Sequence, residues 1–227
     1  MRYSLRSIEK FGRNVGRVYI VGNKPDFIND NVTYIPCPDD TNRKHKNILK
    51  KVLCAIEKSD ISRHFIISSD DHFYTREVDF DQYPVYYQAR EICTQAPNGK
   101  KPNNYYLSLF DTRRMLKKWG LPLYQTNPHC NTHFDADMYR LYYPLFAEAL
   151  ETEYGGEMNC LMGNILINGG VQPTYFVDKK IGVFKDTADL IKQIDGVECF
   201  SISDDAVLCG IGGYLKTLFP NKSKYEK

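Results

Sequence analysis

The chain has 227 residues, of which 42% are hydrophobic and 26% are charged, and lysine and arginine exceed aspartate and glutamate by only two. These values exclude a disordered or collagen-like chain and give no argument for binding nucleic acid, and no apolar run is long enough to cross a membrane. At roughly 150 residues per domain the length fits one large domain or two small ones. Because no segment reads as a linker, we expect a single domain, residues 1–227.

The cysteines and the N-terminus indicate a reducing compartment. There are seven cysteines, an odd number without a Cys-x-x-Cys pair, and the N-terminus has no apolar signal segment. Free thiols in a cytoplasmic protein are therefore expected. Most of the cysteines have apolar neighbours and are predicted to be small core residues.

The first 70 residues alternate between helical and extended patterns. Apolar spacing predicts a helix over residues 3–11 that ends at Gly12. Residues 43–58 form a second amphipathic segment, preceded by side chains that can cap a helix. The β-branched runs that predict strands are residues 17–21, 32–35 and 64–68. Such alternation predicts a largely parallel sheet that is flanked by helices.

The rest of the chain is more helical and less regular. The polar segment 90–104 is long for a loop and predicts a lid over a ligand. Further extended segments are expected at residues 85–87, 172–177, 181–184 and 199–201. Further helices are expected at residues 107–119, 135–153, 187–194 and 206–219. The pattern as a whole predicts one α/β domain with a more helical C-terminal half.

An acidic pair at the end of the third predicted strand is the strongest chemical signal. Asp70, Asp71 and His72 follow the apolar residues 65–67. Ligands of open α/β sheets lie beyond the carboxyl ends of the strands. Adjacent carboxylates repel each other, and Mn²⁺ or Mg²⁺ shared with substrate phosphates relieves that repulsion. The alternative is a capped turn that carries an exposed acid, and the pair alone does not decide between them.

A basic helix start precedes the same strand. Lys44, Lys46 and Asn47 open the segment 43–58. In a βαβ unit the helix begins at the edge where the next parallel strand ends, so these side chains are predicted to share a crevice with Asp70. Lysines and helix amides bind anions there. Carboxylates for a metal and cations for phosphates together predict a nucleotide-diphosphate site, with a solvated basic surface as the alternative.

A second cluster, Asn-Pro-His-Cys-Asn-Thr-His-Phe-Asp, ends at Asp135 and contains His129 and His133. A histidine of this cluster is expected to join the metal, contact phosphate or transfer a proton. The alternative is a helix cap with His133 on the surface. The candidates for a catalytic base are Asp135, Asp137 and Glu91, and sequence spacing favours none of them.

Several blocks of the sequence resemble one known family. RYSLRSIEK, the following VYIVG and a His-Phe-Ile strand that ends in Asp-Asp resemble the Stealth-type sugar-phosphate transferases. KHKNIL, SSDDHF, Cys-Asn-Thr-His and the final SISDDA and LFPNKSKYE are similar to segments of phage and bacterial glycosyltransferase-like proteins. The resemblance covers nearly the whole chain in scattered blocks. It implies a GT-A-like (Rossmann-like) fold with a mostly parallel mixed sheet.

The resemblance also implies roles for particular residues, because an Asp-x-Asp-type motif in such enzymes holds Mn²⁺ or Mg²⁺ and the nucleotide diphosphate. The expected metal ligands are Asp70, Asp71, His72 and His133. The expected donor-binding residues are Lys44, Lys46, Asn47 and Asp70, and the expected catalytic residues are Asp71, His133 and Asp135. His72 replaces the usual third acid. The family's first strand, which precedes RYSLRSIEK, is expected to be missing here.

The expected function is a metal-dependent transferase that moves a sugar or sugar phosphate from a nucleotide-activated donor to an acceptor hydroxyl, on a carbohydrate or another molecule. The alternative is a non-catalytic GT-A-like module that binds a carbohydrate or a partner, which the missing strand and His72 favour. A metal-dependent nuclease is a third hypothesis, for which the sequence offers few converging carboxylates.

Overall fold

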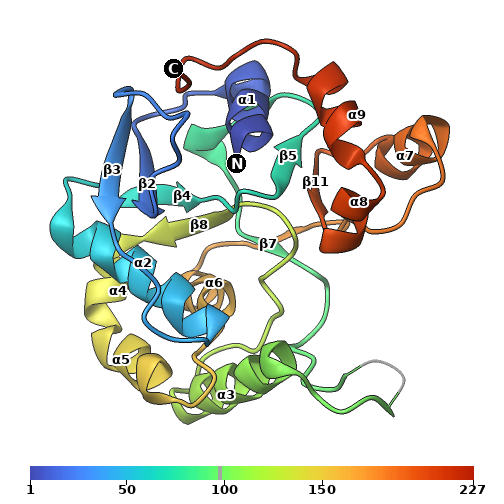
Figure 1. Cartoon of the computed structure of the whole chain (residues 1–227). Helices are drawn as coiled ribbons and strands as arrows, with labels where there is room; N and C mark the ends of the chain where they lie inside the picture. Colours follow the sequence, from blue (N-terminus) through green and yellow to red (C-terminus); the bar gives the residue numbers. More distant parts are fainter. Residues whose placement is uncertain (97–98) are drawn as a thin grey trace.

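Helices pack around several small sheets in the computed structural model, which describes residues 1–96 and 99–227 (Figure 1). The predicted lid, 90–104, contains residues 97 and 98, which lie outside the described residues. The helices before the middle of the chain are α1 (Arg2–Phe11), α2 (Lys44–Lys58) and α3 (Asn104–Lys118), with a 3-10 turn η1 (Phe80–Gln82). The later helices are α4 (Ala136–Leu141), α5 (Tyr143–Glu151), α6 (Met158–Asn168), α7 (Thr187–Ile194), α8 (Asp204–Leu208) and α9 (Ile211–Leu218).

The strands are short and pair locally. The parallel pairs are β1 (Gly12–Arg13) with β6 (Val78–Asp79), β2 (Val18–Gly22) with β3 (Val32–Pro36), β7 (Tyr86–Tyr87) with β9 (Thr174–Tyr175), and β10 (Lys180–Ile181) with β11 (Cys199–Ile202). The antiparallel pairs are β4 (His64–Ile67) with β8 (Thr132–Asp135), and β5 (His72–Tyr74) with β11. Within the described residues these pairs form five sheets of two or three strands. The fold is therefore mixed α/β, but the extended parallel sheet that we predicted is not formed.

Elements with strong local signals lie where the sequence predicts them. The helices α1 and α2 and the strands β2, β3 and β4 match their predicted ranges within two residues. The helix α7 matches its prediction at both ends, and the Asp186 carboxylate accepts a hydrogen bond from the Asp189 amide, 2.8 Å away, as an N-cap should.

Two of the predicted helices are each divided in the structure. Residues 135–153 form α4 and α5, which meet at Tyr142, because Pro144 lies in the first turn of α5 and cannot continue the preceding helix. Residues 206–219 lie in α8 and α9, which are separated by Gly210 at a left-handed φ of 82°. Proline and glycine therefore act as boundaries inside segments that otherwise have helical spacing.

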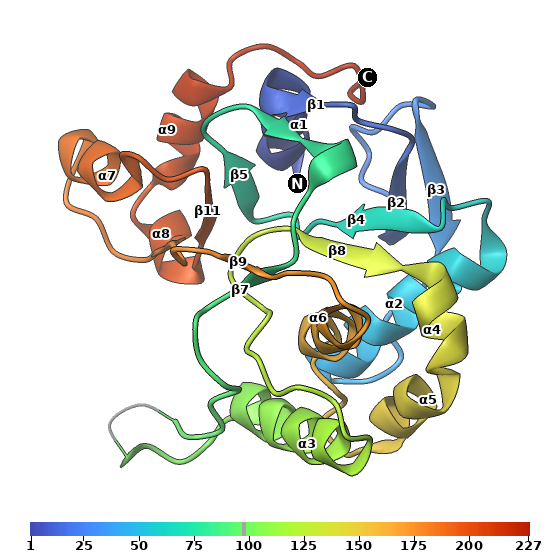
Figure 2. The same cartoon turned by 180° about the vertical axis from the view of Figure 1, so that it is seen from behind.

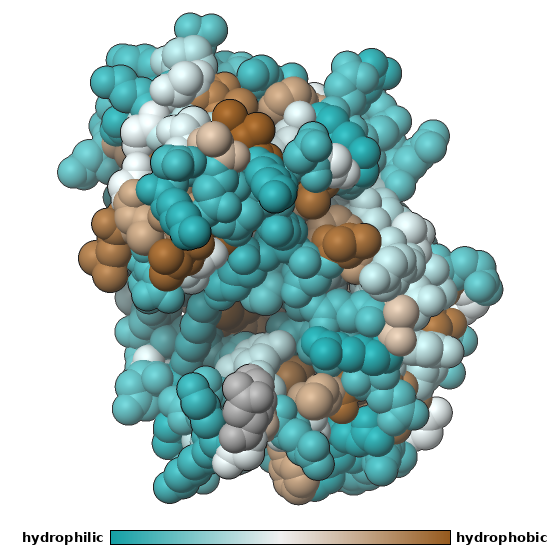
Figure 3. Space-filling view, turned by 90° about the vertical axis from the view of Figure 1, so that its right-hand side faces the viewer, coloured by the Kyte–Doolittle hydropathy of each residue, from teal (hydrophilic) through white to brown (hydrophobic). Residues whose placement is uncertain are grey.

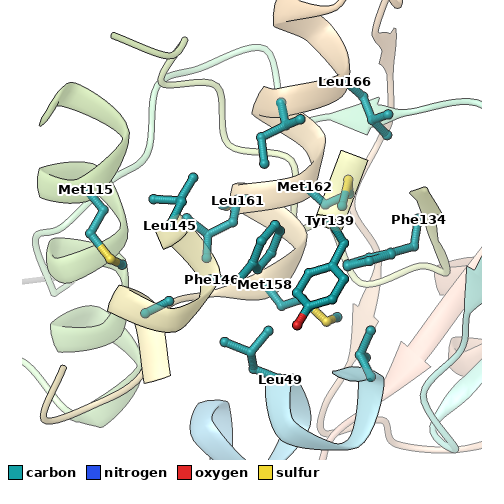
Figure 4. Packing of buried hydrophobic residues seen from close by; sticks show 14 of the residues in the cluster. Leu49, Met115, Phe134, Tyr139, Leu145, Phe146, Met158, Leu161, Met162 and Leu166 are labelled. Carbon is teal, nitrogen blue, oxygen red and sulfur yellow. The ribbon is translucent and has the colours of Figure 1, made fainter. Parts of the chain in front are cut away.

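The helix α6 was not predicted, and it is the centre of the main core. Its residues are apolar on every side, so they show no amphipathic period, which is typical of a fully buried helix. Figure 4 shows Leu161 and Met162 of α6 among Leu49 of α2, Phe134 of β8 and Phe146 of α5. All of these side chains except Leu49 come from the second half of the chain.

A close contact at α6 gives a stability prediction. A Cβ atom added to Gly163 would overlap the side chain of Thr126, so the interface between α6 and this segment requires glycine. We expect Gly163→Ala to lower the free energy of unfolding by about 1–3 kcal/mol in urea denaturation, although alanine favours helix by about 1 kcal/mol. Gly213→Ala in α9 is the control, because a Cβ there meets nothing within 4 Å. Equal stability of the two variants would contradict this packing.

A second apolar cluster joins the C-terminal helices to β5 and β11. Phe73 of β5 and Phe200 of β11 lie with ring centroids 5.3 Å apart, and Phe219, which follows α9, packs against Phe73. The seven cysteines are free, and five of them are buried, as predicted. Among the described residues, no helix combines the length and apolar character that crossing a membrane would require.

Candidate functional site

The acidic pair lies in the turn that joins β4 to β5, beside the start of α1. The Met1 amino group donates a hydrogen bond of 2.9 Å to the Asp70 carbonyl oxygen. The side chains of Asp70 and Asp71 are 68% and 38% exposed. Both carboxylates are therefore accessible to a ligand from solvent, at the carboxyl end of β4 as the sequence predicted.

His72 connects the acidic turn to a second segment of the chain. Its ring is buried, Nδ1 lies 3.1 Å from Oδ1 of Asn131, and Nε2 lies 3.7 Å from Oδ1 of Asp71. Burial lowers the pKa of His72, and the charge of Asp71 only partly opposes this effect. Both ring nitrogens of His72 thus face protein oxygen atoms, one from Asp71 in the acidic turn and one from Asn131.

Buried polar atoms near His72 lack partners. Ser201 of β11 lies directly opposite His72 in the antiparallel register. Within the described residues, Ser201 Oγ and Asn131 Nδ2 are buried and form no hydrogen bond. Buried polar groups are nearly always paired. A water molecule or a ligand atom at this place would therefore complete the hydrogen bonding of Ser201 Oγ and Asn131 Nδ2.

A histidine–aspartate pair lies next to this segment. The Asp178 oxygens are 2.9 and 3.0 Å from Nδ1 of His129, and the His129 backbone amide donates to Asp178 at 2.7 Å. The Gln88 amide also donates to Asp178, at 2.8 Å. Burial acts to raise the pKa of Asp178, but the contacts with His129 outweigh it and the pKa is lowered. Asp178 is thus an ionised, well-held partner for Nδ1–H of His129.

The strands β7 and β9 hold this pair in place. Gln88 directly follows β7, Asp178 lies three residues after β9, and the two strands are parallel neighbours. The remaining ring nitrogen of His129, Nε2, makes no hydrogen bond within residues 1–96 and 99–227, and the side chain is partly exposed. An imidazole that is fixed through Nδ1 and open at Nε2 is the arrangement of a general base.

His133 and Asp135 lie on β8, the antiparallel partner of β4. The register pairs Asp135 with His64, at the end of β4 that lies farthest from Asp70, and pairs His133 with Ile66, near the carboxyl end of β4. The His133 ring contacts the Tyr83 carbonyl oxygen at 3.2 Å and His64 Nδ1 at 3.3 Å. The structure therefore gives His133 protein partners at both nitrogens and does not bring it to Asp70.

Asp135 serves the local structure of α4. Its carboxylate caps the helix by accepting hydrogen bonds from the amides of Asp137 and Met138, at 2.8 and 3.1 Å, and it forms an ion pair of 3.2 Å with Arg63. Burial acts to raise the pKa of Asp135, but these contacts lower it overall. Both carboxylate oxygens of Asp135 are engaged with protein groups, at the end of β4 that lies farthest from Asp70. The structure therefore favours His129 over Asp135 as a base.

The four expected metal ligands do not gather. In the described part of the chain, no three His, Cys, Asp or Glu side chains converge in a way that could hold a metal ion. Asp70 and Asp71 remain as exposed oxygen ligands. Such a pair fits Mg²⁺ or Mn²⁺ that keeps several waters and shares substrate phosphates, and it does not fit a cage made only of protein ligands.

The basic residues of α2 line a different hollow. Lys44 and Asn47 lie in an open pocket of about 400 Å³ together with Thr41 and Lys51, and its described lining does not include Asp70 or Asp71. The backbone of Lys46 instead packs against Gly155. Figures 1 and 2 both place the first turn of α2 well below the start of α1, where Asp70 lies. The single crevice that the sequence predicted is therefore two separate regions.

The molecule is hollowed on the side that carries the C-terminal helices. Figure 3 shows a hydrophilic depression between an upper and a lower part of this face. In Figure 1 the same side has α7, α8 and α9 above and the segment that leads to α3 below, with β7 between them. The strand that precedes Gln88 thus lies at the level of the hollow, where a polar substrate can approach.

Comparison with known proteins gives no identity for the chain. No protein-family model matches it, and no curated protein matches it. The resemblance to Stealth-type transferases therefore rests on the motifs alone.

Proposed function

We propose that the protein is a metal-dependent transferase that moves a sugar or sugar phosphate from a nucleotide-activated donor to an acceptor hydroxyl. The observation that carries this proposal is the position of the buried His72 ring. One of its nitrogens faces the exposed Asp71 carboxylate, and the other faces Asn131, which lies two residues after His129 of the His129–Asp178 pair. An anion-handling centre next to a general base is what transfer to a hydroxyl requires.

The residues have distinct roles in this proposal. A divalent cation held by Asp70 and Asp71 would neutralise the charge that develops on the leaving group, which is the nucleoside diphosphate when a sugar moves and the nucleoside monophosphate when a sugar phosphate moves. Nε2 of His129 takes the proton of the acceptor hydroxyl, and Asp178 fixes the ring tautomer and stabilises the imidazolium that forms. The resemblance supports the same roles for the acidic pair and suggests a GT-A-like arrangement with Lys44, Lys46 and Asn47 as donor contacts. Because Lys44 and Asn47 line a separate pocket, those contacts do not carry the proposal.

Titration calorimetry with uridine diphosphate, with and without Mn²⁺, tests the donor site. We expect binding that requires Mn²⁺, and we expect Asp71→Asn to weaken it about tenfold or more, because one of two metal-binding carboxylates is lost. Asp30→Asn is the matched control, since this carboxylate is fully exposed in the loop between β2 and β3. Lys44→Ala tests separately whether the pocket of α2 contributes to donor binding.

Two outcomes would contradict the transferase. The first is the absence of Mn²⁺-dependent binding of uridine, guanosine, cytidine and thymidine diphosphates. The second is nucleotide binding that Asp71→Asn leaves unchanged. Either result would favour the non-catalytic module that binds a carbohydrate or a partner.

A further inference from the structure

Three tyrosines form a continuous aromatic surface outside the core. The Tyr87 ring lies edge-to-face against Tyr124, with centroids 5.8 Å apart, and against Tyr175, with centroids 6.4 Å apart. We call Tyr87, Tyr124 and Tyr175 the tyrosine platform. Single exposed aromatic residues are common on protein surfaces, but three that are linked through contacts of Tyr87 form a patch that requires an explanation.

The platform is built by three extended segments that lie side by side. Tyr87 of β7 is the register partner of Tyr175 in β9. On the other side, Tyr124 bridges to Glu91, and the Gln125 amide donates to the Arg90 carbonyl oxygen at 2.9 Å. Rings that project from neighbouring strands of one ribbon are held in position by the backbone, so the platform is preorganised.

The platform is accessible and amphipathic. Tyr124 is 41% exposed and Tyr175 is 59% exposed. The three hydroxyl groups form no hydrogen bonds to protein within the described residues. The platform therefore offers both ring faces and free hydroxyls to a ligand.

A charged pair borders the platform. Glu91 is the bridge partner of Tyr124, so the two side chains project from the same face of the ribbon. The Arg113 guanidinium donates to the Glu91 carboxylate at 2.7 Å. Planar carboxylate and guanidinium groups can each bind two neighbouring hydroxyls at once. An aromatic surface with such a border suits a ring that has C–H bonds on its face and hydroxyls at its edge.

We propose that the tyrosine platform binds a saccharide, which is the acceptor in the proposed transfer. This inference deepens the proposed function and rests on it for the word acceptor. Pyranose rings stack their C–H faces on aromatic rings, and their hydroxyls are suited to Glu91 and Arg113. A protein partner would instead be expected to need a larger and more apolar surface.

The position of the platform agrees with an acceptor role. Gln88, which follows Tyr87, donates to Asp178, and Asp178 lies three residues after Tyr175. The ribbon that carries the platform thus also holds the partner of His129. The platform and the His129–Asp178 pair are thus supported by the same two strands, β7 and β9.

Ligand-observed saturation-transfer NMR with maltohexaose, cellohexaose and chitohexaose tests the platform on the intact protein. We expect at least one hexasaccharide to bind, and we expect Tyr175→Ala to lower its affinity roughly fivefold to tenfold, because a stacking face is lost. Tyr175→Phe should retain the affinity, and Glu91→Gln should reduce it. Tyr143→Ala, which removes a tyrosine that is 54% exposed on α5, is the matched control and should have no effect.

The outcomes separate this inference from the proposed function. If no hexasaccharide binds, or if Tyr175→Ala binds as the wild type does, the platform is not a saccharide site, whatever the nucleotide titrations show. If a hexasaccharide binds through the platform but no nucleotide binds with Mn²⁺, the result supports the saccharide site and contradicts the transferase function. Binding that Tyr143→Ala also weakens would place the saccharide elsewhere and overturn the inference.

Discussion

Replacement of His129 by alanine is expected to lower the rate of transfer by about 10²–10⁴-fold, the usual contribution of a general base. Among the described residues, Nε2 of His129 has no hydrogen-bond partner, whereas both ring nitrogens of His72 and of His133 face protein atoms. Because the base does not contact the diphosphate, Mn²⁺-dependent nucleotide affinity should be unchanged. Single-turnover rates at saturating donor, measured together with calorimetry, give both quantities.

A second variant distinguishes a base from a residue that only supports the structure. Asp178→Asn keeps the shape of the pair but turns an amide toward Nδ1, so the ring is no longer held in the required tautomer, and the rate should fall while the protein stays folded. His64→Ala is the control, because that imidazole is exposed on β4 and contacts His133. Equal rates for wild type and His129→Ala would exclude His129 as the base, and joint loss of rate and nucleotide affinity would indicate a structural role.

The sequence predicted those helices and strands whose signals, such as a cap or a β-branched run, lie within or next to the element itself. The helix α7 has its own cap at Asp186, and β2 is a β-branched run that ends at glycine. In contrast, β8 follows turn-forming residues and becomes a strand only through its antiparallel pairing with β4. The helix α6 has no clear amphipathic period, so the spacing of apolar residues did not predict it. Its burial depends on packing against the rest of the domain.

The same division applies to the candidate site. Asp70 and Asp71 could be found because an apolar strand runs directly into them. The pair of His129 and Asp178 could not be found, because 49 residues separate them and the contact depends on the parallel pairing of β7 and β9. Asp135 was a plausible acid in the sequence, but its position before α4 makes it a helix cap. Sequence spacing thus identifies functional residues that follow the end of a strand. It does not identify pairs of residues that only a tertiary contact brings together.

A nearly buried ion pair between α1 and the segment after α9 is the largest single electrostatic contribution that we expect to stability. Nε and Nη2 of Arg6 donate to the two carboxylate oxygens of Glu226 at 2.7 and 2.9 Å. The side chains are 10% and 3% exposed. The Ser223 amide also donates to Glu226, at 2.9 Å, and Arg6 donates to the carbonyl oxygen of Phe219. This ion pair therefore joins α1 to the segment after α9, in a region that is almost inaccessible to water.

Glu226→Gln is expected to lower the free energy of unfolding by about 3–5 kcal/mol at pH 7, because it leaves the Arg6 charge buried without a counterion. Glu77→Gln is the matched control: it removes the partner of Arg13 from an ion pair that is exposed on both sides, and the loss there should stay below about 1 kcal/mol. Urea denaturation of the three proteins gives both differences.

The effect of Glu226→Gln must depend on pH in one direction. Burial acts to raise the pKa of Glu226, but the hydrogen bonds from Arg6 and Ser223 outweigh it and lower the pKa to about 2. An unfolded glutamate has a pKa of about 4.3. The stabilisation is therefore complete above about pH 5 and is lost as the pH falls from there toward 2, where the folded carboxylate also takes up a proton. The difference in unfolding free energy between wild type and Glu226→Gln should accordingly shrink between pH 5 and pH 2. A constant difference over this range would show that the variant acts through packing and not through the charge of Glu226.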